Sequence, residues 1–295
     1  MSKEQVRKKY AACSVVNKKY LRYLEVFSYS LIRMNPSFDS DYIVFYLEGD
    51  LISEDFDRLR RIYSGFIFKK INTANYSNVT PAKAAALAKR TRIGEWTYYR
   101  LEQFTLEEYD QVFWFDVDML VLKNLDDLFN MRNDDKILAC EDLIIKSKHK
   151  SPGDEKQPPY ILQGGVNVVG KNLLNKKIYN DLISLLQDAY KYDRYDRWGK
   201  TQSQSLYAEY FGDSGRIKHI NPMFNLNRKI FVNTITNKFE VSNINAKDVY
   251  ILHYPGSKKP IDLKNNTYIK KCSSFIPWHK ADTEMEVVVR YGHVK

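Results

Sequence analysis

The sequence predicts an α/β fold with a mixed, mainly parallel central sheet flanked by helices. In the first half of the chain, helical segments alternate with short apolar strands, an order typical of βαβ units. Residues 112–115, Val-Phe-Trp-Phe, form an apolar run typical of a strand buried on both faces. The chain has 295 residues, 44% hydrophobic and 28% charged, enough for one large domain or two small ones with a substantial core.

The first half supplies regularly spaced elements. Leucine and phenylalanine recur at helical spacing from Leu21 to Leu31, and Thr80 followed by Pro81 is a helix start with a hydroxyl cap. Strands are expected at residues 10–16, 42–47, 65–71 and 112–115. Helices are expected at residues 19–34, 54–62, from 80 onward, and 97–108.

The second half has a mixed pattern. Strands are expected at residues 136–140, 160–169 and 249–252, and helices at 172–190 and 202–210. Residues 146–159 are rich in charge, proline and glycine, which predicts a mobile loop and not a domain linker.

Compartment and solubility follow from simple features. The chain has no stretch of eighteen apolar residues, and its first ten residues lack the apolar centre of a signal peptide. Cys13, Cys140 and Cys272 are far apart and in no metal-ligand spacing, which favours a reducing compartment. We therefore expect a cytoplasmic protein without a membrane span.

The net charge of +10 and the 22 tyrosines raise the question of nucleic-acid binding. Lysine and arginine are spread along the whole chain and mixed with acidic residues, however, so no basic stripe is predicted. Nucleic acid is not the expected partner. A basic protein also attracts smaller anions, among them nucleotide diphosphates.

Asp116 and Asp118 directly follow the apolar strand. Because residues two apart in an extended segment point the same way, both carboxylates can lie on one side of the backbone and hold Mn²⁺ or Mg²⁺. The metal would keep positions open for a diphosphate. The alternative is that both residues cap the next turn, but Asn124, Asp126 and Asp127 already supply that chemistry just downstream.

Spacing alone is weak evidence for this pair. Asp39 and Asp41, and Asp55 and Asp57, have the same spacing, typical of surface acids. The apolar run of residues 112–115 distinguishes Asp116 and Asp118, because a deeply buried strand should not end in two carboxylates unless their charge is compensated.

Polar residues follow other predicted strands, where ligands of open α/β sheets bind. Asn17 follows the first strand, and His253 a late one. A neutral imidazole would complete a set of metal ligands with the two carboxylates, although a lone histidine after a strand is more often a structural hydrogen-bonding group. Gly256 and Lys259 can bring backbone and positive charge to a phosphate, or form an ordinary basic turn.

Together these residues resemble the glycogenin-like retaining glycosyltransferases, family 8, of the GT-A fold, over about residues 10–260. The matching positions are Asn17, Tyr20, Arg100, Asp116-Val117-Asp118, His253, Gly256 and Lys259. The resemblance implies that Asn17 and Tyr20 hold the base and ribose and that Arg100 binds the donor. It also implies that the D-x-D pair and His253 bind the metal and that Lys259 contacts the diphosphate.

Other matches concern the donor sugar. Asp142 matches an aspartate that contacts sugar hydroxyls, and Gln163 stands where the family has asparagine. Gln204 matches the glutamine of a D-x-x-D-Q element, which implies a polar stabiliser near the anomeric carbon. Both aspartates of that element are replaced, by Lys200 and Ser203. Either the donor sugar differs, or Asp193 or Asp196 substitutes, or activity is low.

The resemblance implies transfer, with retention, of a hexose from a UDP-sugar, UDP-glucose or UDP-galactose, to a hydroxyl of a glycan, protein or small molecule. Mn²⁺ is the expected cofactor, with Mg²⁺ as the alternative. The expected domain spans residues 1–260, with a nucleotide-binding half at 10–120, an acceptor half at 121–260, and a packed extension at 261–295. A homodimer is compatible with this organisation.

Two other functions stay open. A nucleotide-sugar-binding scaffold with weakened catalysis would explain Lys200 and Ser203. A phosphohydrolase of the haloacid dehalogenase type also places D-x-D after an apolar strand, usually near the N-terminus and followed by threonine or valine. Here the motif is mid-chain, and Met119 and Leu120 follow it.

Overall fold

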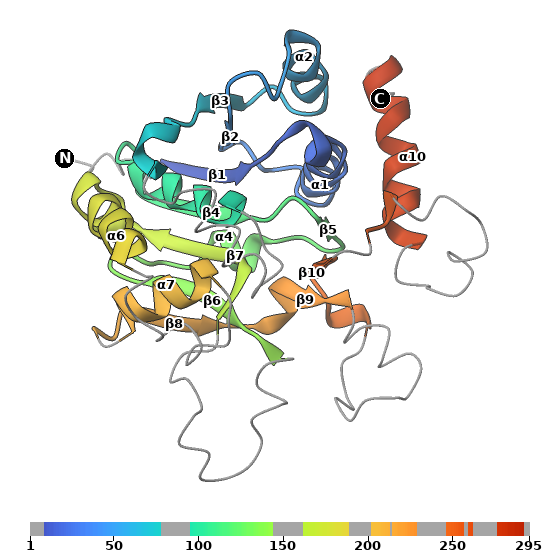
Figure 1. Ribbon diagram of the computed structural model, residues 1–295. Helices are drawn as coiled ribbons and strands as arrows, with labels where there is room; N and C mark the ends of the chain where they lie inside the picture. Colours follow the sequence, from blue (N-terminus) through green and yellow to red (C-terminus); the bar gives the residue numbers. More distant parts are fainter. Residues whose placement is uncertain are drawn as a thin grey trace, which may run out of the picture.

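The computed structural model describes most of the chain, and Figure 1 shows the arrangement of its elements. The described residues are 9–77, 95–143, 162–188, 202–212, 214–228, 246–256, 259–261 and 276–291. The predicted helix from Thr80 and the predicted loop at 146–159 lie outside them. Within this part, no helix is both long and apolar enough to cross a membrane.

A seven-stranded sheet in the order β3-β2-β1-β4-β7-β6-β8 forms the centre. Its strands are β1 (Tyr10–Val15), β2 (Asp41–Tyr46), β3 (Phe66–Lys70), β4 (Gln111–Phe115), β6 (Ile137–Glu141), β7 (Leu162–Gly170) and β8 (Ile217–Ile220). Strand β7 is antiparallel to both of its neighbours, and the other pairs are parallel. The predicted mixed, mainly parallel sheet is confirmed.

A second sheet of three short strands lies beside it, in the order β5-β10-β9. These strands are β5 (Met119–Val121), β9 (Leu226–Asn227) and β10 (Ile251–His253). Since β4 ends at Phe115 and β5 begins at Met119, the chain crosses from one sheet to the other through residues 116–118.

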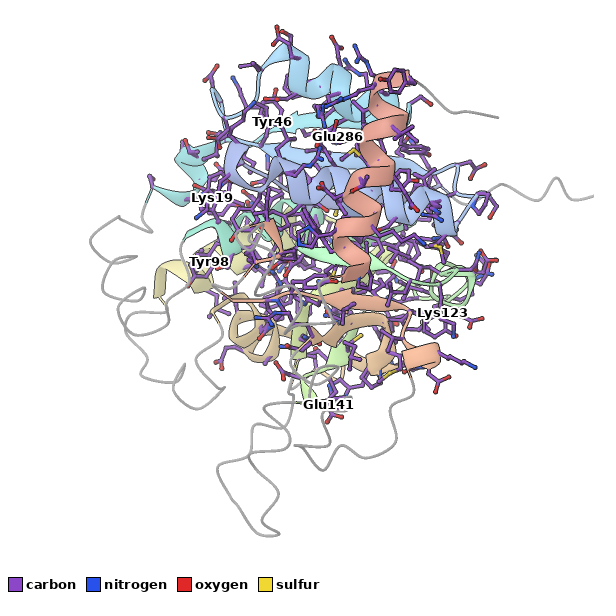
Figure 2. The ribbon with its side chains drawn as sticks, turned by 90° about the vertical axis from the view of Figure 1, so that its right-hand side faces the viewer. Lys19, Tyr46, Tyr98, Lys123, Glu141 and Glu286 are labelled. Carbon is purple, nitrogen blue, oxygen red and sulfur yellow. The ribbon has the colours of Figure 1, made fainter. Side chains whose placement is uncertain are left out.

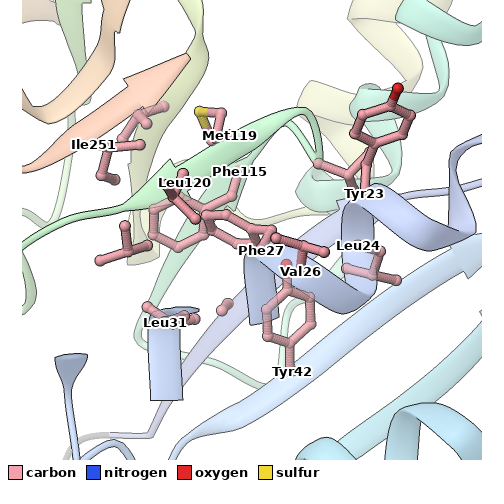
Figure 3. Close-up of a cluster of buried hydrophobic side chains, with 14 of the residues drawn as sticks. Tyr23, Leu24, Val26, Phe27, Leu31, Tyr42, Phe115, Met119, Leu120 and Ile251 are labelled. Atoms are coloured by element: carbon pink, nitrogen blue, oxygen red, sulfur yellow. The ribbon is translucent and has the colours of Figure 1, made fainter. Parts of the chain in front are cut away.

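Helices cover both faces of the central sheet. In the described part of the chain, those with eight or more residues are α1 (Leu21–Met34), α2 (Ser53–Ile62), α6 (Lys176–Asp188), α7 (Gln202–Phe211) and α10 (Ile276–Tyr291). One buried cluster joins α1, β5, β10 and α10, and the other joins α6, α7 and β4. In Figure 3, Phe27 of α1 lies against Phe115 of β4, with ring centroids 5.3 Å apart, and Leu120 and Ile251 extend the first cluster into the second sheet.

The predicted helices at 19–34, 54–62 and 202–210 and all the predicted strands are present with ends shifted by up to two residues. The 172–190 helix begins later, at Lys176, after a 3-10 turn, η5 (Lys171–Leu173). The sequence prediction missed β5, β8, β9 and α10 and the short helix α4 (Asp126–Phe129).

The helix predicted at 97–108 is present, but as the 3-10 helices η3 (Glu95–Thr97) and η4 (Tyr99–Thr105) and not as an α-helix, and it ends three residues early. Aromatic and β-branched residues lower its α-helical propensity. At three residues per turn, Tyr99 and Glu102 share one line of the helix, and Arg100 and Gln103 share the next. Arg100 and Glu102 thus face different neighbours, Asp116 and Tyr179 respectively.

Candidate functional site

Residues 116–118 form the link between the two sheets, and both sheets fix its backbone. The Asp116 amide donates to the Gly165 carbonyl of β7 at 2.8 Å. The Tyr254 amide, next to β10, donates to the Asp118 carbonyl at 2.9 Å. Val117 is buried in the apolar cluster of α1. The two carboxylates consequently lie close together where the sheets meet.

His253 joins these carboxylates, as the sequence predicted. Its Nε2 lies 3.3 Å from Asp118 Oδ1 and 3.9 Å from Asp116 Oδ2. One candidate ligand atom from each of the three residues falls within 4.8 Å of the others. Two hard carboxylate oxygens and an imidazole nitrogen suit Mn²⁺, so the residues present fit the expected metal.

Asn225 orients the imidazole from behind. It ends the 3-10 turn η7 (Pro222–Asn225), and its Oδ1 lies 2.8 Å from His253 Nδ1. The amide oxygen can only accept, so Nδ1 donates to it, and Nε2 is the ring nitrogen that faces the carboxylates. Such a partner of a metal-binding histidine fixes both tautomer and ring orientation.

Arg100 lies against the other side of Asp116. Its Nη2 is 3.0 Å from Asp116 Oδ1, and its Nη1 donates to the Gly164 carbonyl at 2.9 Å. The indole of Trp114 donates to the same Asp116 oxygen at 2.9 Å, and the guanidinium lies 5.4 Å from the Trp114 ring centre. One carboxylate oxygen of Asp116 is therefore held, while Oδ2 faces His253.

Two adjacent glycines of β7, Gly164 and Gly165, make room for these side chains. The pairing of β6 with β7 shifts between Ala139, opposite Asn167, and Cys140, opposite Gln163. Residues 164–166 are accommodated in this irregularity. A Cβ on Gly164 would overlap the Arg100 guanidinium, and one on Gly165 would come within 2.7 Å of the His253 ring. Sequence reasoning missed this role, although paired glycines inside a strand signal a close approach.

Lys259 compensates the charge of Asp118. Its ammonium forms an ion pair with Asp118 Oδ2, donates to the Tyr254 carbonyl at 2.9 Å, and lies 5.6 Å from the Tyr20 ring centre. Burial acts to raise the pKa of Asp118, but His253 and Lys259 outweigh it and hold this pKa well below its usual range. Asp118 is thus a carboxylate in the folded protein, ready to bind a cation.

Asn17 caps the turn that follows β1. Its Oδ1 accepts from the Tyr20 amide at 3.1 Å and begins the 3-10 turn η1 (Lys18–Tyr20). Lys18 makes two hydrogen bonds of 2.7 Å to Asp55 at the start of α2. Asn17 therefore shapes the turn that places Tyr20 beside Lys259.

The structure describes some of the remaining predicted site residues and not others. Gly256 has φ +92°, a conformation that favours glycine. Gln163 is buried in β7, and Asp142 directly follows β6. Gln204 of α7 approaches Gly164, because a Cβ built there would lie 3.2 Å from Gln204 Cγ. Lys200, Asp193, Asp196 and the side chain of Ser203 lie outside the described structure.

Solved structures of glycosyltransferases have similar folds. Galactosyltransferase LgtC, in complex with donor and acceptor sugar analogs, superposes with a TM-score of 0.65 at 18% identity, over 93% of this chain and 95% of that one. The bifunctional glycosyltransferase WbbM gives 0.64 at 16% identity, over 99% and 53%. GlyE of Streptococcus pneumoniae TIGR4 gives 0.63 at 18% identity, over 96% and 62%. The predicted GT-A fold is confirmed.

No curated protein sequence gives a significant match to this chain. The sequence model named glycosyl transferase family 8, however, matches residues 13–260, most of the chain and all of the site residues above. The predicted family is thereby confirmed, and the chain belongs to glycosyl transferase family 8.

Proposed function

We propose that this glycosyltransferase moves a hexose from a UDP-sugar to a hydroxyl acceptor, with retention and with Mn²⁺ held by Asp116, Asp118 and His253. The observation that carries the proposal is the convergence of these three ligand groups within 4.8 Å. Arg100 and Lys259 lie against the same two carboxylates. Two cations beside a divalent metal site suit a diphosphate.

The residues of the site can stabilise the negative charge that develops on the leaving group. When the bond from the anomeric carbon to the diphosphate breaks, negative charge grows on the leaving phosphate oxygen. A bound divalent metal would supply electrostatic stabilisation of that charge. Arg100 and Lys259 can donate charge-assisted hydrogen bonds to the same phosphates, and their burial strengthens this effect.

The nucleotide is proposed to lie along the turn after β1. Asn17 shapes this turn, and Tyr20 presents a ring there. Residue Val117 lies between the two carboxylates, so its backbone can contact the nucleoside. Gly256 leaves its backbone open to the diphosphate, because no atom of the described residues lies within 4 Å of the position of a Cβ.

The sugar is assigned to the region of Asp142, Gln163 and Gln204. Gln204 is the polar stabiliser near the anomeric centre, which its approach to Gly164 and Arg100 supports. Retention follows if the acceptor oxygen attacks the face that the phosphate leaves, with the phosphate accepting its proton. UDP-glucose and UDP-galactose are the proposed donors, and a glycan, protein or small molecule the acceptor.

The test is a panel of UDP-sugars, measured by thermal shift and by donor hydrolysis and transfer with and without Mn²⁺. The expected result is a stabilised and hydrolysed donor only with the metal, and loss of turnover in Asp116→Ala and Asp118→Ala. Asp57→Ala is the matched control, because Asp57 is exposed and belongs to a pair with the same spacing. The expectation that this pair is a surface pair is wrong for Asp55, which is buried and bound by Lys18.

Undiminished turnover in both site variants would contradict the proposal. UDP binding without hydrolysis or transfer of any donor would favour the alternative of a catalytically weakened scaffold. That alternative is motivated by Lys200 and Ser203, and detectable metal-dependent transfer excludes it. Metal-dependent phosphate release from simple phosphomonoesters would instead favour a phosphohydrolase.

A further inference from the structure

We propose that helix α10, through Trp278, positions the nucleotide-binding turn after β1. Helix α10 lies beyond residues 13–260, the segment matched by the family model. The inference rests on the proposed function, since it concerns how Tyr20 and Lys259 are held to receive a nucleotide diphosphate. Trp278 is a positioning residue, because its contacts are with other side chains of the protein.

Helix α10 lies over α1 and α2, as Figures 1 and 2 show from two directions. The side chains it buries are aligned along one side, since Trp278, Ala281, Met285 and Val289 recur at helical spacing. Trp278 and Met285 are fully inaccessible to solvent, at 0% exposure. The helix is thus part of the core on this face of the sheet.

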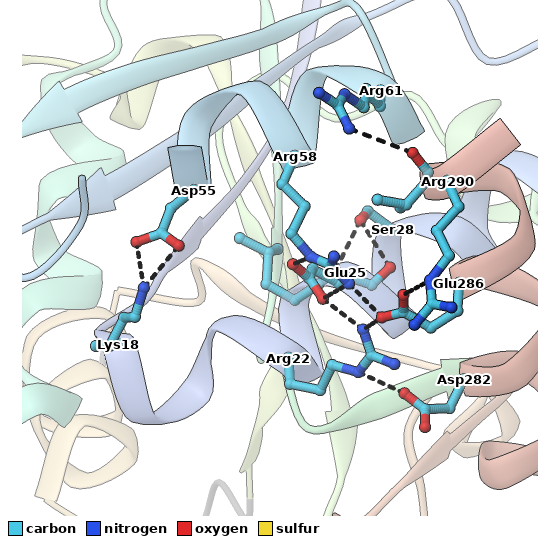
Figure 4. A network of polar contacts seen from close by, with 12 residues as sticks. Lys18, Arg22, Glu25, Ser28, Asp55, Arg58, Arg61, Asp282, Glu286 and Arg290 are labelled. Carbon is cyan, nitrogen blue, oxygen red and sulfur yellow. Dashed lines mark hydrogen bonds and ion pairs between the residues drawn. The ribbon is translucent and has the colours of Figure 1, made fainter. Parts of the chain in front are cut away.

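Ion pairs fix the helix in register, and Figure 4 shows them. Arg22 of α1 pairs with Asp282 at 2.6 Å and with Glu286. Arg58 of α2 also pairs with Glu286, and both arginines contact the buried Glu25. Two arginines around one buried glutamate leave one excess positive charge. Helix α10 brings Asp282, Glu286 and Arg290, which lies 3.6 Å from Glu286, and these three residues together carry the one negative charge that balances it. Docking of α10 therefore completes the charge balance of the α1–α2 surface.

A line of aromatic rings connects α10 to the site. The Trp278 ring lies 5.6 Å from Tyr23, and Tyr23 lies 5.5 Å from Tyr20. The ammonium of Lys259 then lies 5.6 Å from the Tyr20 ring centre and pairs with Asp118. Tyr23 is buried at 2% exposure, so Trp278 and Tyr20 bound the space it occupies. Loss of the indole would let Tyr23, and with it Tyr20, shift away from Lys259.

The turn has a second support, which makes the role of Trp278 specific. Lys18 joins the turn to α2 through Asp55, while Tyr20 joins it to α10 through Tyr23. The ion pair of Lys18 holds the backbone of the turn, and the contact with Tyr23 holds the Tyr20 ring. Removing Trp278 should therefore affect nucleotide affinity more than it affects the presence of the turn.

The test compares Trp278→Leu, Trp278→Phe and Val289→Ala in the full chain. Val289 is the matched control, because it is buried on α10 three turns farther on, and its carbonyl faces Arg61 of α2. The measurements are the Kd for UDP with Mn²⁺ by calorimetry, the thermal midpoint, and KM and kcat for the donor.

We expect Trp278→Leu to weaken UDP binding by about fivefold to tenfold, the size of a lost cation–π contact. KM should rise with little change in kcat, and Trp278→Phe should restore most of the affinity. Val289→Ala should lower the thermal midpoint without changing the Kd. Should Trp278→Leu fail to fold, Tyr23→Leu interrupts the same line of rings with the α10 ion pairs intact, and the same rise in Kd is expected.

An unchanged Kd in both Trp278→Leu and Tyr23→Leu, or an equal rise in Val289→Ala, would overturn the inference. Such a result is distinguishable from failure of the proposed function. In that second case the unaltered protein itself would bind no UDP in the presence of Mn²⁺.

Discussion

The guanidinium of Arg100 lies in the space that a side chain at residue 164 would fill. Gly164 meets it with a bare backbone, and its carbonyl accepts from Arg100 Nη1 at 2.9 Å. Gly164, which has no side chain, thereby orients Arg100 towards Asp116. The position of the Arg100 guanidinium depends on the absence of a methyl group at residue 164.

We therefore predict that Gly164→Ala lowers kcat/KM for the donor by about a hundredfold, the typical cost of moving a catalytic group by about 1 Å. The measurement is a double-mutant cycle with Arg100→Ala. If Gly164→Ala acts through Arg100, it should have little further effect in the Arg100→Ala background. Additive losses would show that the new methyl group acts elsewhere, for example on Gln204.

Asn225→Ala should weaken Mn²⁺ binding by about tenfold to a hundredfold, because His253 loses the acceptor that fixes its tautomer. Titration with Mn²⁺ followed by electron paramagnetic resonance measures this in the nucleotide-free protein. Asn221→Ala is the control, since Asn221 caps the same turn through the Met223 amide. Equal weakening in both variants would assign the effect to the turn and not to His253.

Lys259→Met should have opposite effects on the affinities for UDP and for Mn²⁺. UDP binding should weaken by about tenfold or more through loss of a charge-assisted hydrogen bond. Binding of Mn²⁺ without nucleotide should tighten, because the ammonium that pairs with Asp118 no longer competes with the metal. Lys123→Met, which removes a lysine lying over the Tyr250 ring, should change neither affinity. Weaker metal binding in Lys259→Met would refute the competition.

Glu102 should destabilise the protein at neutral pH. Burial raises its pKa, and the hydroxyls of Tyr76 and Tyr179, which donate to it at 2.8 and 2.9 Å, offset only part of this rise. The folded state then binds a proton more tightly than the unfolded state, whose pKa is near 4.5. Stability contributed by this group is present below pH 4.5 and lost as pH rises through the folded pKa.

Glu102→Gln keeps the acceptor oxygen for both tyrosines and removes the buried charge. We expect about 1 kcal/mol of added stability at pH 7 and a smaller fall in stability above pH 4.5, measured by urea unfolding across the pH range. A loss of stability at pH 7 in Glu102→Gln would show that the charged form is the better partner for Tyr76 and Tyr179.

Local patterns in the sequence were sufficient to predict six of the seven strands of the central sheet, all except β8. The run at 112–115 is apolar because β4 is buried on both faces, and the spacing of Asp116 and Asp118 follows from extended backbone. The meeting of His253 with these carboxylates was suggested by its place after a late strand and supported by the family resemblance, whereas its antiparallel pairing with Met119 was not predicted.

Other features depend on contacts that no local pattern reports. Local propensity does not indicate the 3-10 form of η4, because its central Arg-Leu-Glu-Gln favours an α-helix. The 3-10 form places Arg100 against Asp116 and Glu102 against Tyr179. Gly164 and Gly165 are understood only when Arg100 and His253 lie beside them. Trp278 belongs to a segment outside the matched family region, so neither motif nor resemblance indicated its place next to Tyr23.

The two carboxylates have different anchors, since Asp116 is held by β7 and Asp118 by the residue after β10. A ligand that contacts both therefore acts as a cross-link between two separately hydrogen-bonded units. Part of the binding free energy of this ligand therefore stabilises the association of the two sheets. Residues of β5 and β10 that do not contact the ligand themselves, such as Val121 and Ile251, should exchange their amide protons more slowly when it is bound.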